Sequence, residues 1–468
     1  MVQAESVFRK VLERITPTEK DRQETDSALS MIMKATDAVI GPLKLKKTLA
    51  GSYLRDTWLS DKKEFDIFIM FQPSVPREEL ERTGLDVGKK IVKALEGSYE
   101  IAYAEHPYVR AKVGKFAVDF VPCYDVDDPN KIQSAVDRTP YHNKYILKNL
   151  KPGMSQEVRL LKQFCKGIGV YGSDLRVEGF SGYLAELLTI RYGTMKNLVM
   201  DARGWEAGKA VIDLEGHHRE KRTDMKSKFP GQALVVIDPV DRDRNVAAAL
   251  SAANFELFRH SCTAFLKSPD ESYFRAWSNV ESKAQLLSTM KKRGTKIIAI
   301  SLPKPKIVDD IIFPQLRKSV KRITGMLQED DFRVMGSEAW SDDKRCVMLF
   351  ELEVWELPAV RRITGPPVFA AMHADQFIKK YAGRCRLWVE GSTWLAEDSR
   401  ASRTADECLA KGLKGDSRRL VNAGIASYIA EGISGGFEMM SGREAAALAG
   451  KDEGFALFLT KYFKKKIV

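Results

Sequence analysis

A short alternating segment at residues 64–68 constrains the fold of this chain more than any other feature. It reads Glu-Phe-Asp-Ile-Phe, a pattern typical of a β-strand with one face in a hydrophobic core. Because residues i and i+2 of a strand point to the same side, Glu64 and Asp66 converge while Phe65 and Ile67 face the core. Two converging carboxylates repel each other unless a cation lies between them, and Mg²⁺ suits such oxygen ligands. The segment therefore predicts a sheet that carries a divalent metal site.

A third acid completes the predicted site. Residues 116–121 read Phe-Ala-Val-Asp-Phe-Val, a second strand-like segment with Asp119 as its one charge. If this strand lies beside the first, Asp119 joins Glu64 and Asp66 around the same pair of ions. Two-metal sites of this kind serve in-line phosphoryl transfer. The alternative is that these are ordinary acids at strand ends, since a lone Glu-x-Asp is common.

A Gly-Ser pair precedes the acidic strand and narrows the interpretation. Gly51 and Ser52 follow the short apolar stretch 48–50 and are predicted to open a short helix. Backbone N–H groups and a hydroxyl at that position suit phosphate oxygens. A Gly-Ser turn, an acidic pair and a distant strand acid in one α/β context favour a two-metal phosphoryl-transfer site over the alternative of ordinary strand-end acids.

At this point the sequence resembles the archaeal (class I) tRNA CCA-adding enzymes, which are polymerase-β-like nucleotidyltransferases. The resemblance rests on GSYLRDTW at 51–58, EFD at 64–66, YAEHPY at 103–108, VDFVPCY at 118–124, SAVDRTPYH at 134–142, VRLLK at 158–162, GFSGY at 179–183, VIDPVD at 236–241 and RNVAA at 244–248. It is close over roughly the first 260 residues and holds only in outline over the last 200. The wider superfamily usually has Asp at the first acid of the pair, so Glu64 departs from that pattern but fits the archaeal branch.

The resemblance implies an activity and a set of site residues. The activity is template-independent addition of C, C and A to the 3′ end of tRNA from CTP and ATP, with two Mg²⁺ ions and release of pyrophosphate. Glu64 and Asp66 would hold both ions, and Asp119 the ion that activates the attacking hydroxyl. The triphosphate would be bound by Gly51, Ser52, Arg55, Thr139, His142, Lys162 and Tyr171.

Three of these residues have structural alternatives. Lys162 lies beside the apolar face of its predicted helix, so it either reaches into a cleft or only extends its stem along apolar surface. His142 could be a buried histidine with its hydrogen bonds satisfied. Tyr171 could stack on a base or ribose, or could close the edge of a core.

Arg244 is expected, by the resemblance, to select C or A together with the RNA backbone. A planar guanidinium suits the acceptor edge of cytosine and the ring nitrogens of adenine. The alternative is that Arg244 is a phosphate-binding arginine of a basic loop, and Arg242, two residues earlier, is a rival for either role. Glu105 and His106 are expected to help seat the 3′ end of the RNA.

The pattern of elements indicates an α+β chain of three domains. Residues 1–151 are expected to form a nucleotidyltransferase domain with a mixed sheet, in which a capping box at 16–19 begins a long helix. Residues 152–275 read as a helical domain that binds nucleotide and RNA, with a Ser181 helix cap. In residues 276–468, a strand at 296–301, a helix after Pro314 and a hairpin at 332–355 suggest an RNA-recognition-like α+β domain followed by a tail.

The composition agrees with an RNA partner. The net charge of +12 suits a polyanion, and basic residues at 217–228, 291–293 and 461–466 are candidates for gripping tRNA. The six cysteines are scattered without metal-site spacing, which favours a reducing cytoplasm. No apolar run has the length of a membrane span, so no membrane partner is expected. The oligomeric state is open, and a homodimer is one alternative.

Two rival functions stay open. One is another template-independent polymerase of the same superfamily, such as a poly(A) or poly(U) polymerase, which the carboxylates cannot separate from CCA addition. The other is a non-catalytic RNA-binding protein that retains a nucleotidyltransferase fold. The intact acids at positions 64, 66 and 119 argue against the second.

Overall fold

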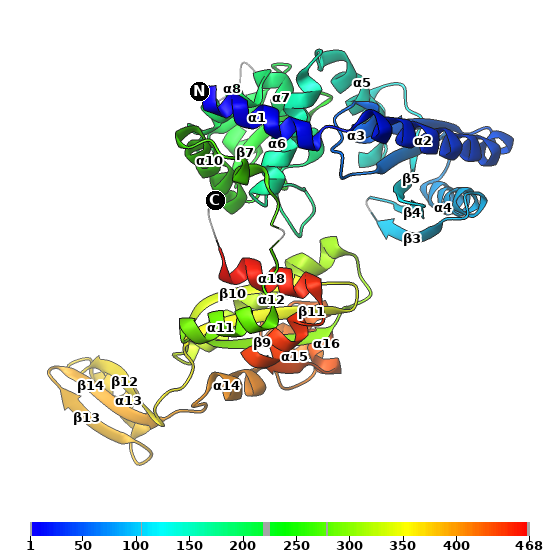
Figure 1. The fold of residues 1–468 in the computed structure, drawn as a ribbon. Coiled ribbons are helices and arrows are strands. Elements are labelled where there is room, and N and C mark those ends of the chain that lie inside the picture. The colour runs from blue at the N-terminus through cyan, green and yellow to red at the C-terminus, as the bar shows by residue number, and fades with distance from the viewer. Residues whose placement is uncertain (1, 104, 219–224, 278, 466–468) are drawn as a thin grey trace. The chain divides into compact units, whose positions relative to one another are not determined.

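The structure is a computed structural model that describes residues 2–103, 105–218, 225–277 and 279–465. The chain forms two compact units, one N-terminal to residue 278 and one C-terminal to it (Figure 1). Each unit has its own sheets and its own buried core. No helix in the described ranges is both long enough and apolar enough to cross a membrane.

The N-terminal unit contains a five-stranded mixed sheet. Its strands, in spatial order, are β1 (Lys46–Ala50), β2 (Glu64–Phe71), β5 (Phe116–Tyr124), β4 (Pro107–Val113) and β3 (Ser98–Tyr103). The β2–β5 pair is parallel and the other pairs are antiparallel. The expected strands at 43–50, 98–105, 107–113 and 116–122 are therefore present within a few residues of their predicted bounds.

Two helices cover one face of this sheet. Helices α2 (Glu19–Ile40) and α4 (Arg77–Ala94) pack over the face that carries Phe65 and Ile67, which are 1% and 0% exposed. A Cβ atom on Gly84 of α4 would lie 2.6 Å from Pro122, so glycine lets this helix approach the sheet closely. The predicted burial of Phe65 and Ile67 is confirmed, and Glu64 and Asp66 belong to the opposite face.

The start of α2 differs from the expectation. The cap is Thr18 rather than Thr16: its hydroxyl accepts a hydrogen bond from the Asp21 backbone, and the Asp21 carboxylate accepts one from the Thr18 backbone. This capping box forms at Thr18 because an acid occupies the third position of the helix that follows it.

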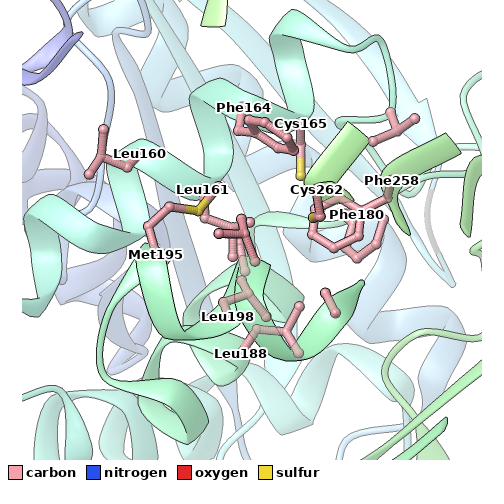
Figure 2. Close-up of a cluster of buried hydrophobic side chains, with 14 of the residues drawn as sticks. Leu160, Leu161, Phe164, Cys165, Phe180, Leu188, Met195, Leu198, Phe258 and Cys262 are labelled. Atoms are coloured by element: carbon pink, nitrogen blue, oxygen red, sulfur yellow. The ribbon is translucent and has the colours of Figure 1, made fainter. Parts of the chain in front are cut away.

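A helical layer completes most of the N-terminal unit. It contains α1 (Val2–Ile15), α5 (Thr139–Asn149), α6 (Met154–Gly167), α7 (Gly182–Tyr192), α8 (Met195–Ala202) and α10 (Ala252–Lys267). The predicted apolar face of α6 is confirmed, since Leu161, Phe164 and Cys165 are fully buried. Figure 2 shows these side chains gathered with Phe180 and Phe258 from other parts of the chain. As predicted, Ser181 caps α7.

A small sheet in this region escaped the sequence interpretation. Strands β6 (Ala210–Asp213), β7 (Leu234–Asp238) and β8 (Asp241–Asn245) lie side by side, with β7 in the centre and buried throughout. The short helix α9 (Met225–Lys228) precedes β7. Within the basic segment 217–228, residues 219–224 lie outside the described residues.

The C-terminal unit is built around a four-stranded antiparallel sheet. Its spatial order is β10 (Arg333–Ser341), β11 (Arg345–Val354), β9 (Lys296–Pro303) and β15 (Glu438–Ser441). Helix α12 (Asp309–Glu329) connects β9 to β10, which confirms the predicted strand–helix–strand–strand order. The helix begins before Pro314 rather than after it, because Ile312 and Phe313 are buried in the same core as Leu316 and hold the first turn in place.

Further helices and a smaller sheet complete this unit. The helices are α11 (Lys283–Arg293), α13 (Ala371–Tyr381), α14 (Ala405–Gly412), α15 (Ser417–Asn422), α16 (Ser427–Gly435), α17 (Gly442–Ala449) and α18 (Glu453–Phe463). The smaller sheet has the order β12 (Val360–Pro367), β14 (Thr393–Ser399), β13 (Arg386–Glu390). The basic segment 461–466 begins in the last turn of α18, whose Phe455 and Tyr462 are buried in the unit's core, and residue 466 lies outside the described residues.

Candidate active site

Asp66 and Asp119 lie side by side on the open face of the five-stranded sheet. They are direct partners in the parallel pairing of β2 and β5, and both are partly buried. Glu64 lies two residues before Asp66 on the same face and is exposed. The expected proximity of the strands that carry positions 66 and 119 is therefore present in the structure.

The three carboxylates influence one another electrostatically. Burial, followed by the charges of Asp119 and Glu64, raises the pKa of Asp66 to about 6, while Arg55 and Lys62 partly oppose that rise. Among the described residues, none donates a hydrogen bond to the Asp66 carboxylate. Asp66 therefore carries a charge that its own surroundings do not neutralise.

The other two acids have cationic partners. Glu64 accepts hydrogen bonds from Lys62 at 3.1 and 3.2 Å. Asp119 accepts them from Arg110 at 3.2 and 3.3 Å. In the described ranges, no three His, Cys, Asp or Glu side chains form a group that could hold a metal ion as they stand. The hard carboxylate oxygens of Asp66 and Asp119 nevertheless suit a divalent cation, which would have to displace Arg110 from Asp119.

Gly51 is the residue that lets the chain turn over Asp66. It begins the short helix α3 (Gly51–Leu54) with φ +81°, and a Cβ atom there would overlap the Asp66 Oδ2. A side chain at position 51 would therefore collide with the carboxylate as well as strain the backbone. Ser52 follows in this helix and is partly buried.

A cleft of about 970 Å³ opens beside this turn. The predicted site residues that line it are Gly51, Arg55, Asp66, Thr139, His142 and Arg244. The remaining ones, Ser52, Glu64, Asp119, Lys162 and Tyr171, are not part of its lining. Residues from the small sheet and the turn before it, such as Asn245 and Gln232, form the other side of the cleft.

Asp238, at the end of β7, connects three residues beside the cleft. Its carboxylate is wholly buried and lies 2.8 Å from His142 Nε2 and 2.6 Å from an Arg244 guanidinium nitrogen. The Tyr183 hydroxyl donates to it at 3.3 Å, and the Tyr183 ring stacks on His142 at 4.2 Å. Burial raises the pKa of Asp238. The hydrogen bond and charge of His142, the Val240 backbone hydrogen bond and the Arg244 charge together nevertheless hold that pKa below its usual value. Burial in turn lowers the pKa of His142.

Lys162 lies inside the protein and does not snorkel to the surface. It is 2% exposed, and its amine donates to the Thr57 carbonyl at 3.0 Å and to the Thr57 hydroxyl at 3.1 Å. Its amine also lies 3.6 Å from the Glu186 carboxylate. Burial lowers the pKa of Lys162 to about 8. Tyr171 is partly buried against the core, and both its hydroxyl and the Lys162 amine lie next to Gly182.

The sequence comparisons identify the family. Residues 39–142 match the nucleotidyltransferase domain, residues 156–275 match the second domain of tRNA nucleotidyltransferase, and residues 293–442 match the C-terminal domain of the CCA-adding enzyme. The CCA-adding enzyme of Methanothermobacter thermautotrophicus is 40% identical over 82% of this chain and 83% of its own length. Those of Methanosarcina acetivorans and Haloarcula marismortui are 37% and 36% identical over 97% and 99% of both chains, respectively. This chain belongs to the CCA-adding enzyme family.

The enzyme is therefore a tRNA nucleotidyltransferase, as the sequence interpretation predicted. In fold comparisons, a solved structure of the Cid1 poly(U) polymerase is 13% identical and aligns with a TM-score of 0.46 over 58% of this chain and 98% of its own. A likeness that loose does not bear on function.

The structure separates the two rival arginines of the enzyme. Arg244 lines the cleft and is held by Asp238, whereas the Arg242 side chain is 71% exposed and lies 4.0 Å from Asp243. Glu105 also lines the cleft and accepts a hydrogen bond from the Ala135 backbone. His106 is 2% exposed, and neither of its ring nitrogens has a hydrogen-bond partner among the described residues.

Several residues of the basic segments form ion pairs with acidic side chains of the protein itself. Arg293 donates to the buried Glu351 at 2.6 and 3.0 Å, so it is engaged within its own unit. Lys464 and Lys465 pair with Glu281 and Glu338 at 3.0 and 2.6 Å. Lys228 pairs with Asp243. Lys291 and Lys292 are exposed members of the 291–293 segment.

Residue-by-residue interpretation missed Glu186, Asp238 and Arg110. Glu186 is an acid inside the apolar run Leu184–Leu188, and Asp238 ends the apolar strand 234–237. A charge in such a run indicates a buried partner, and that signal was available. Arg110 gave no such signal, because its pairing with Asp119 depends on strands β4 and β5 being neighbours.

Proposed function

We propose that the enzyme adds C, C and A in turn to the 3′ end of tRNA, using CTP and ATP without a nucleic-acid template and releasing pyrophosphate. The observation that carries the proposal is the pairing of Asp66 with Asp119 on adjacent parallel strands beside a cleft lined by cationic and polar side chains. Family membership supplies the reaction, and this site supplies a place for it.

Asp66 and Asp119 would hold the divalent ions, with Glu64 as a third ligand once it leaves Lys62. Two Mg²⁺ ions at such a site would neutralise charge on the attacking and leaving oxygens. The raised pKa of Asp66 supports this assignment, because a nearby cation would favour its ionised form.

The rest of the cleft would bind the nucleotide. Arg55 and Thr139 line it, as Asp66 does, and would contact the triphosphate. His142 stacks on Tyr183 and would act beside them. Arg244 would read the base, since its guanidinium has a fixed anchor at Asp238 and lines the same cleft. Ser52, Lys162 and Tyr171 are not in the lining of the cleft, so they would act after substrate-induced adjustment or through their neighbours.

Three domains would share the work. Residues 1–151 would carry the chemistry and residues 152–275 would carry the base-reading side of the cleft. Residues 276–468 would bind tRNA, with the exposed Lys291 and Lys292 as candidate contacts. The six free cysteines favour a reducing compartment such as the cytoplasm.

The test is nucleotide incorporation into tRNA transcripts that end before the CCA sequence, after one C, or after both. The purified enzyme is given each labelled NTP singly and in combination. We expect CMP addition to the first two transcripts, AMP addition to the third, and growth that ends after three nucleotides. Use of UTP, or a long homopolymer tail, would favour the poly(A) or poly(U) polymerase alternative. Tight tRNA binding without incorporation would favour a non-catalytic RNA-binding protein.

A further inference from the structure

We infer that Glu186 is the positioning residue that holds Arg55 and Lys162 in place as charged groups for the nucleotide triphosphate, without touching the substrate itself. The inference rests on the proposed roles of Arg55 and Lys162 in nucleotide binding. Glu186 lies behind the cleft and controls the positions of these two cations and the charge of Lys162.

Glu186 is a carboxylate at a buried position that would ordinarily hold an apolar residue. It lies in the middle of α7, is fully buried, and its neighbours Ala185 and Leu187 along the helix are fully buried as well. Removing a carboxylate from water is unfavourable unless charged partners compensate for the lost hydration. The partners of Glu186 therefore indicate what the residue is for.

Those partners are cations from two other parts of the fold. Its Oε1 accepts hydrogen bonds from the Thr57 hydroxyl at 2.5 Å and from Arg55 Nε at 3.1 Å. Its Oε2 lies 3.0 Å from the same Arg55 nitrogen. The Lys162 amine lies 3.6 Å from Oε1 and also donates to Thr57. Two cations thus share one carboxylate. The cluster of Arg55, Lys162 and Glu186 therefore keeps a net positive charge.

This excess charge lies next to the cleft. Arg55 lines the cleft, and its other guanidinium branch is held by Asn143. Lys162 shares the Glu186 carboxylate with Arg55, and its amine lies near Gly182 at the start of α7, as the Tyr171 hydroxyl does. A triphosphate entering the cleft would meet Arg55, which Glu186 holds from behind, while Lys162 would add its charge from its buried position beside the same carboxylate.

Glu186 also favours the charged form of Lys162. Burial lowers the pKa of Lys162 to about 8, Arg55 and Arg159 lower it as well, and Glu186 opposes all three. The amine also donates to the Thr57 carbonyl, and the Tyr171 hydroxyl, like the amine, lies next to Gly182. Without the Glu186 charge, the Lys162 pKa would fall further, so the amine would be neutral over more of the range above pH 7.

The test compares CTP binding to Glu186→Gln and wild type by calorimetry from pH 7 to 9. The glutamine side chain keeps the shape of the glutamate and can still accept from Thr57, but it lacks the charge. We expect the affinity to begin its fall at a pH lower by roughly one unit, which is about a fivefold loss at pH 8 and roughly a tenfold loss at pH 9 relative to wild type. In steady-state kinetics the KM for CTP should rise by a similar factor, with a smaller change in kcat.

The matched control is Glu157→Gln, on helix α6. Glu157 is a partly buried carboxylate whose hydrogen-bond partner is the Met195 backbone, and it contacts neither cation. Its pH profile for CTP should coincide with that of wild type. In a Lys162→Met background, Glu186→Gln should lose its pH dependence, because the group that titrates is gone.

Glu186→Asp protects the test against a folding failure. It keeps the charge on a shorter arm, so we expect a raised KM with the wild-type pH profile. A Glu186→Gln enzyme that binds CTP as wild type does across the pH range would overturn the inference, as would unfolding of both Glu186 variants, which would mark the residue as purely structural. In either case wild-type CCA addition would still stand, so this failure is distinct from failure of the proposed function.

Discussion

Two carboxylates on interior strands, Asp66 in the N-terminal unit and Glu351 in the C-terminal unit, differ in how their charge is treated. Glu351 lies on β11, is 1% exposed, and accepts hydrogen bonds from Arg293 at 2.6 and 3.0 Å, from Thr295 at 2.6 Å and from Tyr462 at 2.9 Å. Burial raises its pKa, but these bonds outweigh burial and hold the pKa below its usual value. For Asp66, burial and neighbouring acids raise the pKa to about 6.

The comparison distinguishes a structural acid from a site acid. Glu351 ties α11, the turn before β9 and α18 to the sheet through its three partners, so the fold itself uses its charge. Asp66 faces two other acids and a cleft, so its charge is available to a ligand. A partly buried carboxylate that has no hydrogen-bond donor among the described residues indicates a functional role, because an apolar residue at that position would serve the fold better.

The largest expected effect concerns Asp66, the acid of the candidate site. Asp66→Asn should lower kcat for CMP addition roughly 10³-fold or more, because a metal ligand is lost. In the presence of EDTA the same variant should be at least as heat-stable as wild type, since carboxylate repulsion is relieved. The measurements are single-turnover incorporation and thermal unfolding. A variant that keeps its activity, or that unfolds at a markedly lower temperature, would place Asp66 in the structural class instead.

The next largest effect concerns Glu351, the structural acid of the C-terminal unit. Glu351→Ala should destabilise the C-terminal unit by about 2–4 kcal/mol, because the buried end of Arg293 and the Tyr462 hydroxyl lose their acceptor. Urea unfolding followed by circular dichroism measures this loss, and kcat at saturating tRNA and CTP should change less than about twofold. A large fall in kcat with an unchanged urea midpoint would remove the distinction between the two acids.

A smaller effect concerns Asp238, which combines both features. It is buried and fully paired, but its partners His142 and Arg244 line the cleft. Asp238→Asn should lower the preference for CTP over UTP by about 10- to 100-fold, because the guanidinium of Arg244 loses its charged anchor. The measurement is the ratio of kcat/KM for the two nucleotides on tRNA lacking CCA. Arg242→Ala, at an exposed neighbouring position, is the matched control and should leave that ratio within about twofold.

The smallest effect is a pH dependence of opposite sign for the two acids. The pKa of Asp66 is about 6 in the folded chain against an ordinary 3.8, so the folded state holds the proton more tightly and metal-free stability falls as pH rises through that window. Glu351 has a lowered pKa, so its contribution is present above its ordinary value of 4.5 and is lost as pH falls.

Urea titrations in EDTA at pH 4.5 and 6.5 measure this difference. The stability of Asp66→Asn relative to wild type should rise by about 1–2 kcal/mol between the two pH values. The Glu351→Gln variant should show its deficit most fully at pH 6.5. The same direction of change for both variants would contradict the contrast drawn between the two acids.

Much of the site followed from local pattern. The alternation at 64–68 placed Phe65 and Ile67 in the core and the acids on the other face, because strand geometry fixes the side of each residue. The family motifs indicated Arg55, Thr139, His142 and Arg244, and these line one cleft. The bounds of α2 and α12 were less accurate, since Thr18 and Asp21 form the cap of α2 and buried Ile312 and Phe313 extend α12 past a proline.

The sequence by itself determined which residues carry charge, which faces of strands and helices are apolar, and to which family the chain belongs. Only the tertiary structure decided that Arg110 neutralises Asp119, that Glu186 supports two cations, and that Asp238 anchors Arg244. The physical reason is range. Periodicity and capping act within a few residues, whereas the partner of a buried charge can come from any strand or helix that the fold brings alongside it.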